Sequence, residues 1–180
     1  FNAPALARLW VADITYVRTR KGFVYTAFVT DVFSRRIVGW ALSDSMRTEA
    51  LPLQALNQAI VSAKETTGLI HHSDHGSQYV SIVYNERLAE YGIAASTGTV
   101  GDSYDNALAE NVNGSYKNEL IHRRSWDSVV DVEIATFEWV NWWNEVRLHQ
   151  SLGYRTPAEV ESEFWETNPA QEIMEIKANA

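Results

Sequence analysis

LWVADITYVRTRKGFVYTAFVTDVFSRRIVGWAL, residues 9–42, is a stretch in which β-branched and aromatic residues dominate three consecutive runs. Such runs predict β-strands, and the polar and glycine residues between them are typical of tight turns. Because short turns join strands in antiparallel pairs, we expect a three-stranded antiparallel meander. Its strands should cover residues 10–17, 23–32 and 37–42, with turns at 18–22 and 34–36.

Helices and strands alternate in the rest of the chain. Residues 48–64 carry apolar side chains every three or four positions, which predicts an amphipathic helix. This crossover helix favours placing the next short strand, at 69–72, parallel to the first strand. The same patterns predict further helices at 81–91, 106–121 and 129–146, a strand at 93–96 and a short last helix that starts at Pro157.

Three acidic residues occupy positions where a charge is costly. Asp13 lies within the first predicted strand, and Asp74 follows the parallel strand at its carboxyl end. Glu110 lies about one turn into the helix predicted at 106–121. A desolvated carboxylate without a partner costs several kcal/mol, so converging carboxylates normally hold a cation. Hard oxygen ligands favour Mg²⁺ or Mn²⁺.

Each carboxylate also has a purely structural interpretation. Asp13 would form an ion pair with Arg18 or Arg20, Asp74 would be a turn residue, and Glu110 would belong to a solvated helix face. The expected pairing of the first and fourth strands favours a shared site instead, because it sets the two aspartates side by side at the strand ends.

A histidine cluster beside Asp74 raises the possibility of zinc. His71 and His75 form an HxxxH pattern, with His72 between them. That spacing suits a helix, whereas this stretch is predicted as strand and turn, so we disfavour zinc. An influence of one of these histidines on the acidic site stays open.

The helix at 106–121 has one polar face. Asn106, Glu110, Asn113 and Lys117 follow one another at intervals of four, three and four residues, so they share a side of the helix. Gly114, within the same helix, costs roughly 1 kcal/mol relative to alanine, which indicates a close approach by another group. That group is either DNA backbone or the long helix at 129–146.

Tryptophans at helical spacing mark the long helix. Trp139, Trp142 and Trp143 fall on one side of it. Such a stripe is more typical of a core than of a platform for stacking nucleic-acid bases, so we assign it to the core.

Composition indicates one globular domain. The chain has 180 residues, 46% of them hydrophobic, and contains no cysteine. We expect a core over residues 1–166 and a tail over 167–180. No run of 18 apolar residues and no leader pattern is present, which predicts a cytoplasmic protein without a membrane partner. Because the chain starts at Phe1, we expect a longer protein whose N-terminal part could hold a separate DNA-binding module.

The charge balance argues against tight DNA binding by this chain alone. Its net charge is −8, and residues 159–180 contribute −5 of it. Nucleic-acid binders usually carry a basic surface. Two bound divalent cations would offset part of the acidity near the site.

Five motifs, in order along the chain, resemble the catalytic core of bacterial insertion-sequence transposases, a family that shares its DDE core with retroviral integrases. The similarity extends over about residues 9–161. The motifs are LWVADITYV at 9–17, DVFSRRIVGW at 31–40, HSDHGSQY at 72–79, GDSYDNALAENVNGSYKNELIHRR at 101–124 and NEVRLHQSLGYRTPAEV at 144–160.

The resemblance implies a fold and a reaction. The fold is α/β and RNase H-like, with a five-stranded mixed sheet of three antiparallel and then two parallel strands, flanked by helices. The catalytic and metal-binding residues are Asp13, Asp74 and Glu110, with 35 residues between the last two. These residues hold two Mg²⁺ or Mn²⁺ ions, and Asp13 contacts both ions. The reaction is cleavage at transposon ends followed by strand transfer from the freed 3′-hydroxyl, that is, DNA integration and recombination.

The same resemblance implies the partners. DNA is the substrate, and the active form is a homo-multimer. Gln78, Tyr79 and Lys117 match family positions near DNA. Apart from the resemblance, we also expect DNA contacts from Asn106, Arg123 and Arg124. One departure weakens a further contact, because Val100 precedes Gly101 where many family members have a basic residue.

Two other functions are considered. A ribonuclease H or junction-resolving nuclease of the same fold would need a fourth acidic residue, for which Asp102 and Asp105 are nearby candidates. A catalytically inactive DNA-binding relic is the other, and the intact acidic triad counts against it.

Overall fold

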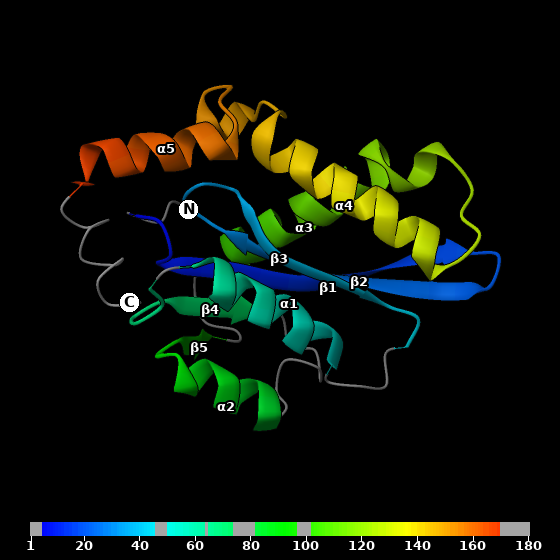
Figure 1. Cartoon of the computed structure of the whole chain (residues 1–180), viewed down its shortest axis with the longest axis horizontal. Coiled ribbons are helices and arrows are strands. Elements are labelled where there is room, and N and C mark those ends of the chain that lie inside the picture. The colour runs from blue at the N-terminus through cyan, green and yellow to red at the C-terminus, as the bar shows by residue number, and fades with distance from the viewer. Residues whose placement is uncertain (1–4, 46–49, 64, 74–81, 97–101, 170–180) are drawn as a thin grey trace.

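The computed structural model of the chain describes residues 5–45, 50–63, 65–73, 82–96 and 102–169, with the side chains of 102–106 left aside. The described residues contain five strands and five α-helices (Figure 1). Their bounds are β1 (Leu9–Thr19), β2 (Gly22–Asp31), β3 (Ile37–Ser43), α1 (Ala50–Ser62), β4 (Ile70–Ser73), α2 (Ile82–Glu90), β5 (Ala94–Ser96), α3 (Asp102–Glu119), α4 (Val129–Glu145) and α5 (Pro157–Thr167). Two short 3₁₀ helices, η2 (Ile121–Arg123) and η3 (Gln150–Leu152), lie in the connections.

The sheet confirms the predicted topology. Its strand order is β3-β2-β1-β4-β5, with antiparallel pairing of β1, β2 and β3 and parallel pairing of β4 to β1 and of β5 to β4. The pairing of β1 with β4 runs from Leu9 opposite Ile70 to Ala12 opposite Ser73. Asp13 is therefore the first residue of β1 beyond this parallel ladder.

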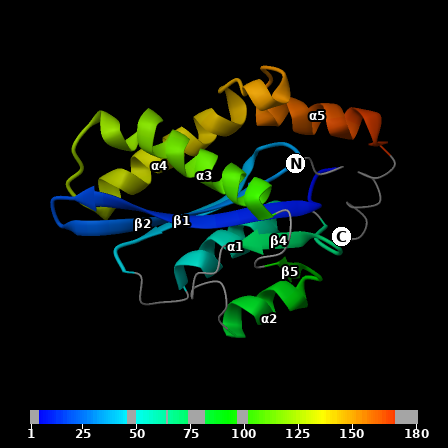
Figure 2. The same cartoon turned by 180° about the vertical axis from the view of Figure 1, so that it is seen from behind.

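Helices cover both faces of the sheet (Figures 1 and 2). The even residues Trp10 and Ala12 of β1 pack into one core with α1 and α2, whereas Val17 packs into a second core with α3 and α4. This alternation follows from the pleat, which turns successive side chains to opposite faces. The odd residues of β1, including Asp13, thus face α3.

The helix at 106–121 starts earlier than predicted. α3 begins at Asp102, so Glu110 lies about two turns into the helix rather than one. The sequence predicts the helix only from residue 106, because the aspartates and serine at 102–105 favour a turn. The same residues are well suited to the first turn of a helix, where a negative charge meets the positive end of the helix dipole.

Specific caps start the last two helices. The carboxylate of Asp131 accepts hydrogen bonds from the backbone N–H groups of Asp127 and Ser128, at 2.8 Å each, and these bonds lower the pKa of Asp131. The Thr156 hydroxyl accepts from the Glu159 N–H, with Pro157 in the first turn as predicted.

Two of the three tryptophans of α4 confirm their predicted place in the core, since Trp139 and Trp143 are buried in the second core. The prediction for Trp142 is wrong, because 40% of its surface is exposed. Within the described residues, no helix is both long and apolar enough to cross a lipid bilayer.

Strand β3 and helix α1 approach each other unusually closely at Gly39. A methyl group built on Gly39 would overlap the carbonyl oxygen of Ala55 and lie 3.0 Å from the Cβ of Ala59. Two hydrogen bonds hold the same contact, from the Trp40 N–H to the Gln58 side chain and from the Ser62 hydroxyl to the Val38 carbonyl.

We therefore expect Gly39→Ala to destabilise the chain by about 1–3 kcal/mol, because the backbones must separate to admit the methyl group. Urea unfolding followed by circular dichroism measures this change. Gly114→Ala is the matched control, since a Cβ there meets nothing within 4 Å among the described residues, and helix propensity should then raise stability by up to about 1 kcal/mol. Equal effects of the two substitutions would contradict the close contact.

A buried histidine joins β4 to α2. His71 is 1% exposed, and its Nε2 lies 2.7 Å from the hydroxyl of Tyr84. Burial lowers the pKa of His71 to about 4, because the charged imidazolium would lose its hydration.

This shift predicts acid sensitivity. Between pH 6.5 and pH 4 the unfolded chain binds a proton at His71 and the folded chain does not, so stability should fall by up to about 1.4 kcal/mol per pH unit as the pH decreases. Urea unfolding of the unsubstituted chain and of His71→Asn across this range checks the sign. The substitution should remove the His71 contribution to the slope, and identical slopes for both proteins would show that His71 does not titrate in this way.

Candidate active site

Asp13 links the centre of the sheet to α3. Its side chain is half-buried, and its two oxygens accept different hydrogen bonds. Oδ1 accepts from the backbone N–H of Ile14 at 2.8 Å, and Oδ2 accepts from the side-chain amide of Asn113 at 2.9 Å. The ion pair considered for Asp13 with Arg20 is wrong, because the guanidinium of Arg20 pairs with Asp127.

The contact from Asn113 identifies the side of α3 that faces β1. Glu110 lies one turn before Asn113 and is exposed, so its carboxylate is accessible on this side of the helix. The Oδ1 atom of Asn113 is buried and has no hydrogen-bond partner among the described residues. A buried carbonyl oxygen without a partner is costly, which makes this atom a candidate acceptor for a group outside the chain.

The donor atoms at this position fit a hard divalent cation. The carboxylate of Asp13 and the unsatisfied amide oxygen of Asn113 are oxygen ligands of the kind that Mg²⁺ prefers. Asp74 lies outside the described residues. Without it, the described residues contain no group of three histidine, cysteine, aspartate or glutamate side chains that could hold a metal ion.

The histidines of β4 do not form a zinc site with each other. His71 contacts Tyr84 on the α2 side, whereas the Nδ1 atom of His72 lies 3.4 Å from the hydroxyl of Ser96. Adjacent residues of a strand point to opposite faces of the sheet, which separates the two imidazoles. His75 lies outside the described residues.

Lys117 and Arg124 lie against aromatic rings. The Nζ of Lys117 lies 4.4 Å from the centre of the Tyr16 ring, and the guanidinium carbon of Arg124 lies 4.0 Å from that of Trp126. Partial burial lowers the pKa of Lys117. Both residues line one groove of about 680 Å³ between the β1–β2 hairpin and the end of α3.

The other predicted DNA contacts are not in this groove or are not described. Arg123 donates from Nε to the Asn118 carbonyl and borders a different hollow, together with Glu119 and Glu138. Gln78 and Tyr79 lie outside the described residues, as does the side chain of Asn106.

Sequence reasoning missed several residues of this region. It did not single out Asn113 as the partner of Asp13, although the four-three-four spacing had set it on the face of Glu110. Arg18, Arg20 and His122 line the same groove as Lys117 and were not assigned there. Their signal was the pair of basic runs, RTRK at the end of the first strand and HRR after α3.

Gly114 distinguishes between the two groups proposed to approach it. A Cβ at this position would meet nothing within 4 Å among the described residues, so α4 does not pack against it. The helix-packing explanation of this glycine is wrong.

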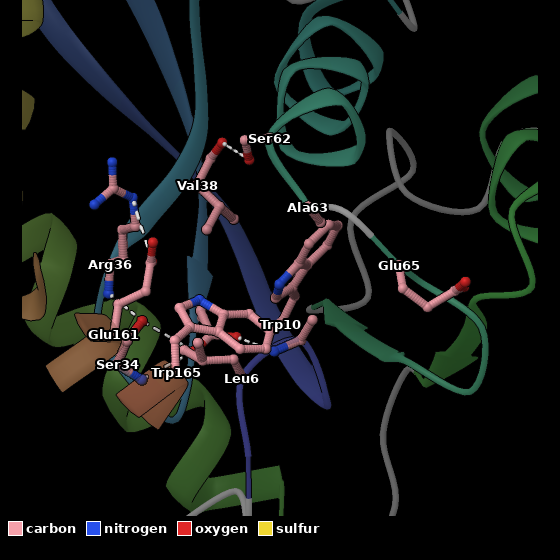
Figure 3. A pocket seen from close by; sticks show the side chains of 12 residues that line it. Leu6, Trp10, Ser34, Arg36, Val38, Ser62, Ala63, Glu65, Glu161 and Trp165 are labelled. Carbon is pink, nitrogen blue, oxygen red and sulfur yellow. Dashed lines mark hydrogen bonds and ion pairs between the residues drawn. The ribbon is translucent and has the colours of Figure 1, made fainter. Parts of the chain in front are cut away.

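A second cavity, of about 250 Å³, lies apart from Asp13 and Glu110 (Figure 3). The indoles of Trp10 and Trp165 border it, and Arg36 lies 3.8 Å from a carboxylate oxygen of Glu161 at its rim. The buried carboxylate of Asp31 accepts hydrogen bonds from the N–H groups of Ala7 and Ser34 and from the Ser34 hydroxyl. Burial raises the pKa of Asp31, and its bonds assign it a structural role at this end of the sheet.

Two family models together match most of the chain. The Integrase core domain family matches residues 4–103, and a second family of the same description matches residues 91–157. The transposase for insertion sequence element IS629 of Shigella sonnei is 54% identical over 92% of this chain and 55% of its own length. The transposase for insertion sequence element IS904 of Lactococcus lactis is 35% identical over 89% of this chain and 64% of its own length. The chain thus spans roughly half to two thirds of the curated relatives.

A solved structure agrees with the fold. The HTLV-2 integrase catalytic core domain in complex with magnesium, in its trimeric form, superposes with a TM-score of 0.69. The match covers 89% of this chain and 99% of that one, at 19% identity, so it shows a shared RNase H-like fold. Because the first family match extends over more than half of the residues, the chain belongs to the integrase core domain family.

Proposed function

We propose that this chain is the catalytic core of a DNA transposase, which cleaves phosphodiester bonds at transposon ends and then joins the freed 3′-hydroxyl to target DNA. The single observation that carries the proposal is the hydrogen bond from Asn113 to Asp13, because it ties the end of the parallel ladder to the helix face that bears Glu110. The names of the similar transposases support the same reaction.

Asp13, Asp74 and Glu110 are the proposed catalytic and metal-binding residues. The β1–β4 register supports this, since Asp13 and Asp74 each follow the last residues of the ladder, Ala12 and Ser73. Two Mg²⁺ or Mn²⁺ ions, when bound by these carboxylates, would supply charge to the attacking and leaving oxygens of an in-line displacement. DNA is the proposed substrate and a homo-multimer the proposed active form.

Asn113 is proposed as a positioning residue. Its amide N–H fixes the orientation of the Asp13 carboxylate, while the Ile14 N–H holds the other oxygen. Because both bonds hold the carboxylate in one orientation, it would lose little side-chain freedom on binding a metal ion. The Oδ1 of Asn113 is buried and has no hydrogen-bond partner among the described residues, so it is a further candidate acceptor.

Removing charge from the acidic residues should abolish the reaction without unfolding the chain. Asp13→Asn, Asp74→Asn and Glu110→Gln should each reduce cleavage and strand transfer by about a hundredfold or more, because a metal-dependent displacement loses its ligands. The assay uses the longer protein with DNA of its own element ends and Mg²⁺. Glu133→Gln, an exposed helical glutamate of α4, is the matched control and should leave the rates unchanged. Full activity in any of the three variants would rule out the shared site.

Asn113→Ala should weaken the use of metal more than it weakens the fold. Loss of the hydrogen bond to a ligating carboxylate typically costs about 10–100-fold in metal affinity or activity. We therefore expect the Mg²⁺ concentration for half-maximal cleavage to rise, with partial recovery of the rate at high Mg²⁺. Asn111→Ala, an exposed asparagine on the same helix, should not change this concentration. A rate defect that is independent of Mg²⁺ would contradict the positioning role.

A further inference from the structure

A groove lies at the end of the sheet where the β1–β2 hairpin meets the junction of α3 and η2. We call it the hairpin groove. Its basic and aromatic lining is Tyr16, Arg18, Arg20, Lys117, His122, Arg124 and Trp126. The backbone N–H of Arg20 donates to the Trp126 carbonyl at 2.9 Å, which joins the two walls. Figures 1 and 2 show the hairpin and the α3–α4 connection side by side in both views.

The hairpin groove concentrates positive charge on an acidic chain. Four of its lining residues are arginine or lysine, and none of the described lining residues is acidic. The net charge of the whole chain is −8. Arg20 is partly neutralised by its ion pair with Asp127 outside the lining. A concave surface of one sign attracts ligands of the opposite sign more strongly than the same charges dispersed over the chain.

Aromatic rings, rather than carboxylates, hold the other three cations. The guanidinium carbon of Arg18 lies 5.6 Å from the centre of the Phe23 ring. The Nζ of Lys117 lies 4.4 Å from the centre of the Tyr16 ring, and the guanidinium carbon of Arg124 lies 4.0 Å from that of Trp126. Among the described residues none of the three has a carboxylate partner. A cation above a ring is held in place but keeps its charge and its outward N–H donors, which suits recognition of phosphate.

The groove lies beyond the proposed active site along both α3 and β1. Lys117 follows Glu110 by seven residues on α3, or about 10 Å along the helix. Arg18 follows Asp13 by five residues on β1, or about 16 Å along the strand. B-DNA rises about 3.4 Å per base pair, so on a duplex that runs from the acidic site toward the groove these distances correspond to about three to five base pairs.

Other side chains already occupy the aromatic rings of the groove. Tyr16 keeps 57% of its surface exposed, but Lys117 lies over its ring and the Phe23 ring meets it edge-on with 5.5 Å between centres. The Trp126 side chain is 3% exposed. Proteins that bind single strands rely on open aromatic faces for stacking, so the lining favours a paired helix that presents its phosphates.

We propose that the hairpin groove binds the phosphate backbone of duplex DNA about three to five base pairs from the phosphodiester bond that reacts. The position relative to the reaction rests on the proposed function. The binding itself rests on the charge and shape of the groove. Arg18 of β1 and Arg124 beyond η2 are its outer phosphate contacts, and Lys117 joins the groove to the acidic site.

The test is a double substitution, Arg18→Gln with Arg124→Gln, measured by fluorescence anisotropy with a labelled duplex of about 30 base pairs and with its single strand. No divalent metal is added, and salt is varied from about 50 to 200 mM. We expect at least about tenfold weaker duplex binding at the lowest salt. The slope of log affinity against log salt should become shallower by about two, since each lost phosphate contact removes about 0.9.

Arg87→Gln with Arg155→Gln is the matched control. Both arginines lie outside the groove in surface ion pairs, with Glu90 and Glu163, so the control changes net charge equally. It should retain the affinity and the salt slope of the unsubstituted chain. Thermal unfolding of both double variants checks that the fold persists. If Arg124→Gln destabilises the packing of Trp126, Arg18→Gln alone replaces the double variant, and it should give half of the change in salt slope.

Three results would overturn the proposal. They are equal losses of binding in the groove and control variants, tighter binding of the single strand than of the duplex, and no duplex binding by the unsubstituted chain at about 50 mM salt. Asp13→Asn separates this proposal from the proposed function. If Asp13→Asn binds the duplex normally but does not cleave, and the groove variant binds normally too, only the groove assignment fails. If Asp13→Asn still cleaves while the groove variant loses binding, only the catalytic assignment fails.

Discussion

The amide–carboxylate hydrogen bond between Asn113 and Asp13 joins two elements that are a hundred residues apart in sequence. On one side of it stands the central strand, which is tied to both neighbours of the sheet. On the other stands α3, which carries Glu110, Gly114 and Lys117 in order along one side. If this bond and the packing around it set the height of α3 over β1, they also set how far the glutamate and the lysine lie from the strand end. The positions of the acidic site and of the hairpin groove relative to β1 therefore depend on the same contact.

The placement of Asp13 follows from the lengths of two strands. β4 pairs with β1 only as far as Ala12, while β2 pairs with β1 through to Thr19. A carboxylate in the middle of a fully paired strand would be enclosed on both sides, whereas at the end of a ladder one side opens to solvent. The short β4 thus makes room for a charge in a strand that is otherwise part of the core.

Much of the fold could be predicted because its signals are local or follow from chain connectivity. Three apolar runs with short turns predict a meander, and a crossover helix before β4 predicts its parallel position beside β1. The start of α3 at Asp102 could not be predicted in the same way, since aspartate and serine suit a turn and a first helical turn equally well. The choice between them depends on tertiary packing.

The candidate site was predictable by residue type but not by partner. Carboxylates at strand ends indicated Asp13 and Asp74, but periodicity alone could not show that Asn113 reaches Asp13. For the same reason, the sequence could not show which of the two arginines after α3 lines the hairpin groove. Arg124 turns toward the hairpin, whereas its neighbour Arg123 turns to the Asn118 carbonyl, and only the path of η2 decides this.

The unequal lengths of β1 and β4 have a cost as well as a use. From Asp13 to Thr19, β4 no longer pairs with β1, so the backbone groups on that side of β1 have no partner in β4 and could pair with a strand of another chain. Charged side chains along this stretch oppose such growth, and Asp13 and Arg18 both lie on it. Lys117 adds a further barrier by reaching over this stretch to Tyr16. Residues proposed here for handling DNA would thus also protect the free protein from sheet-to-sheet aggregation.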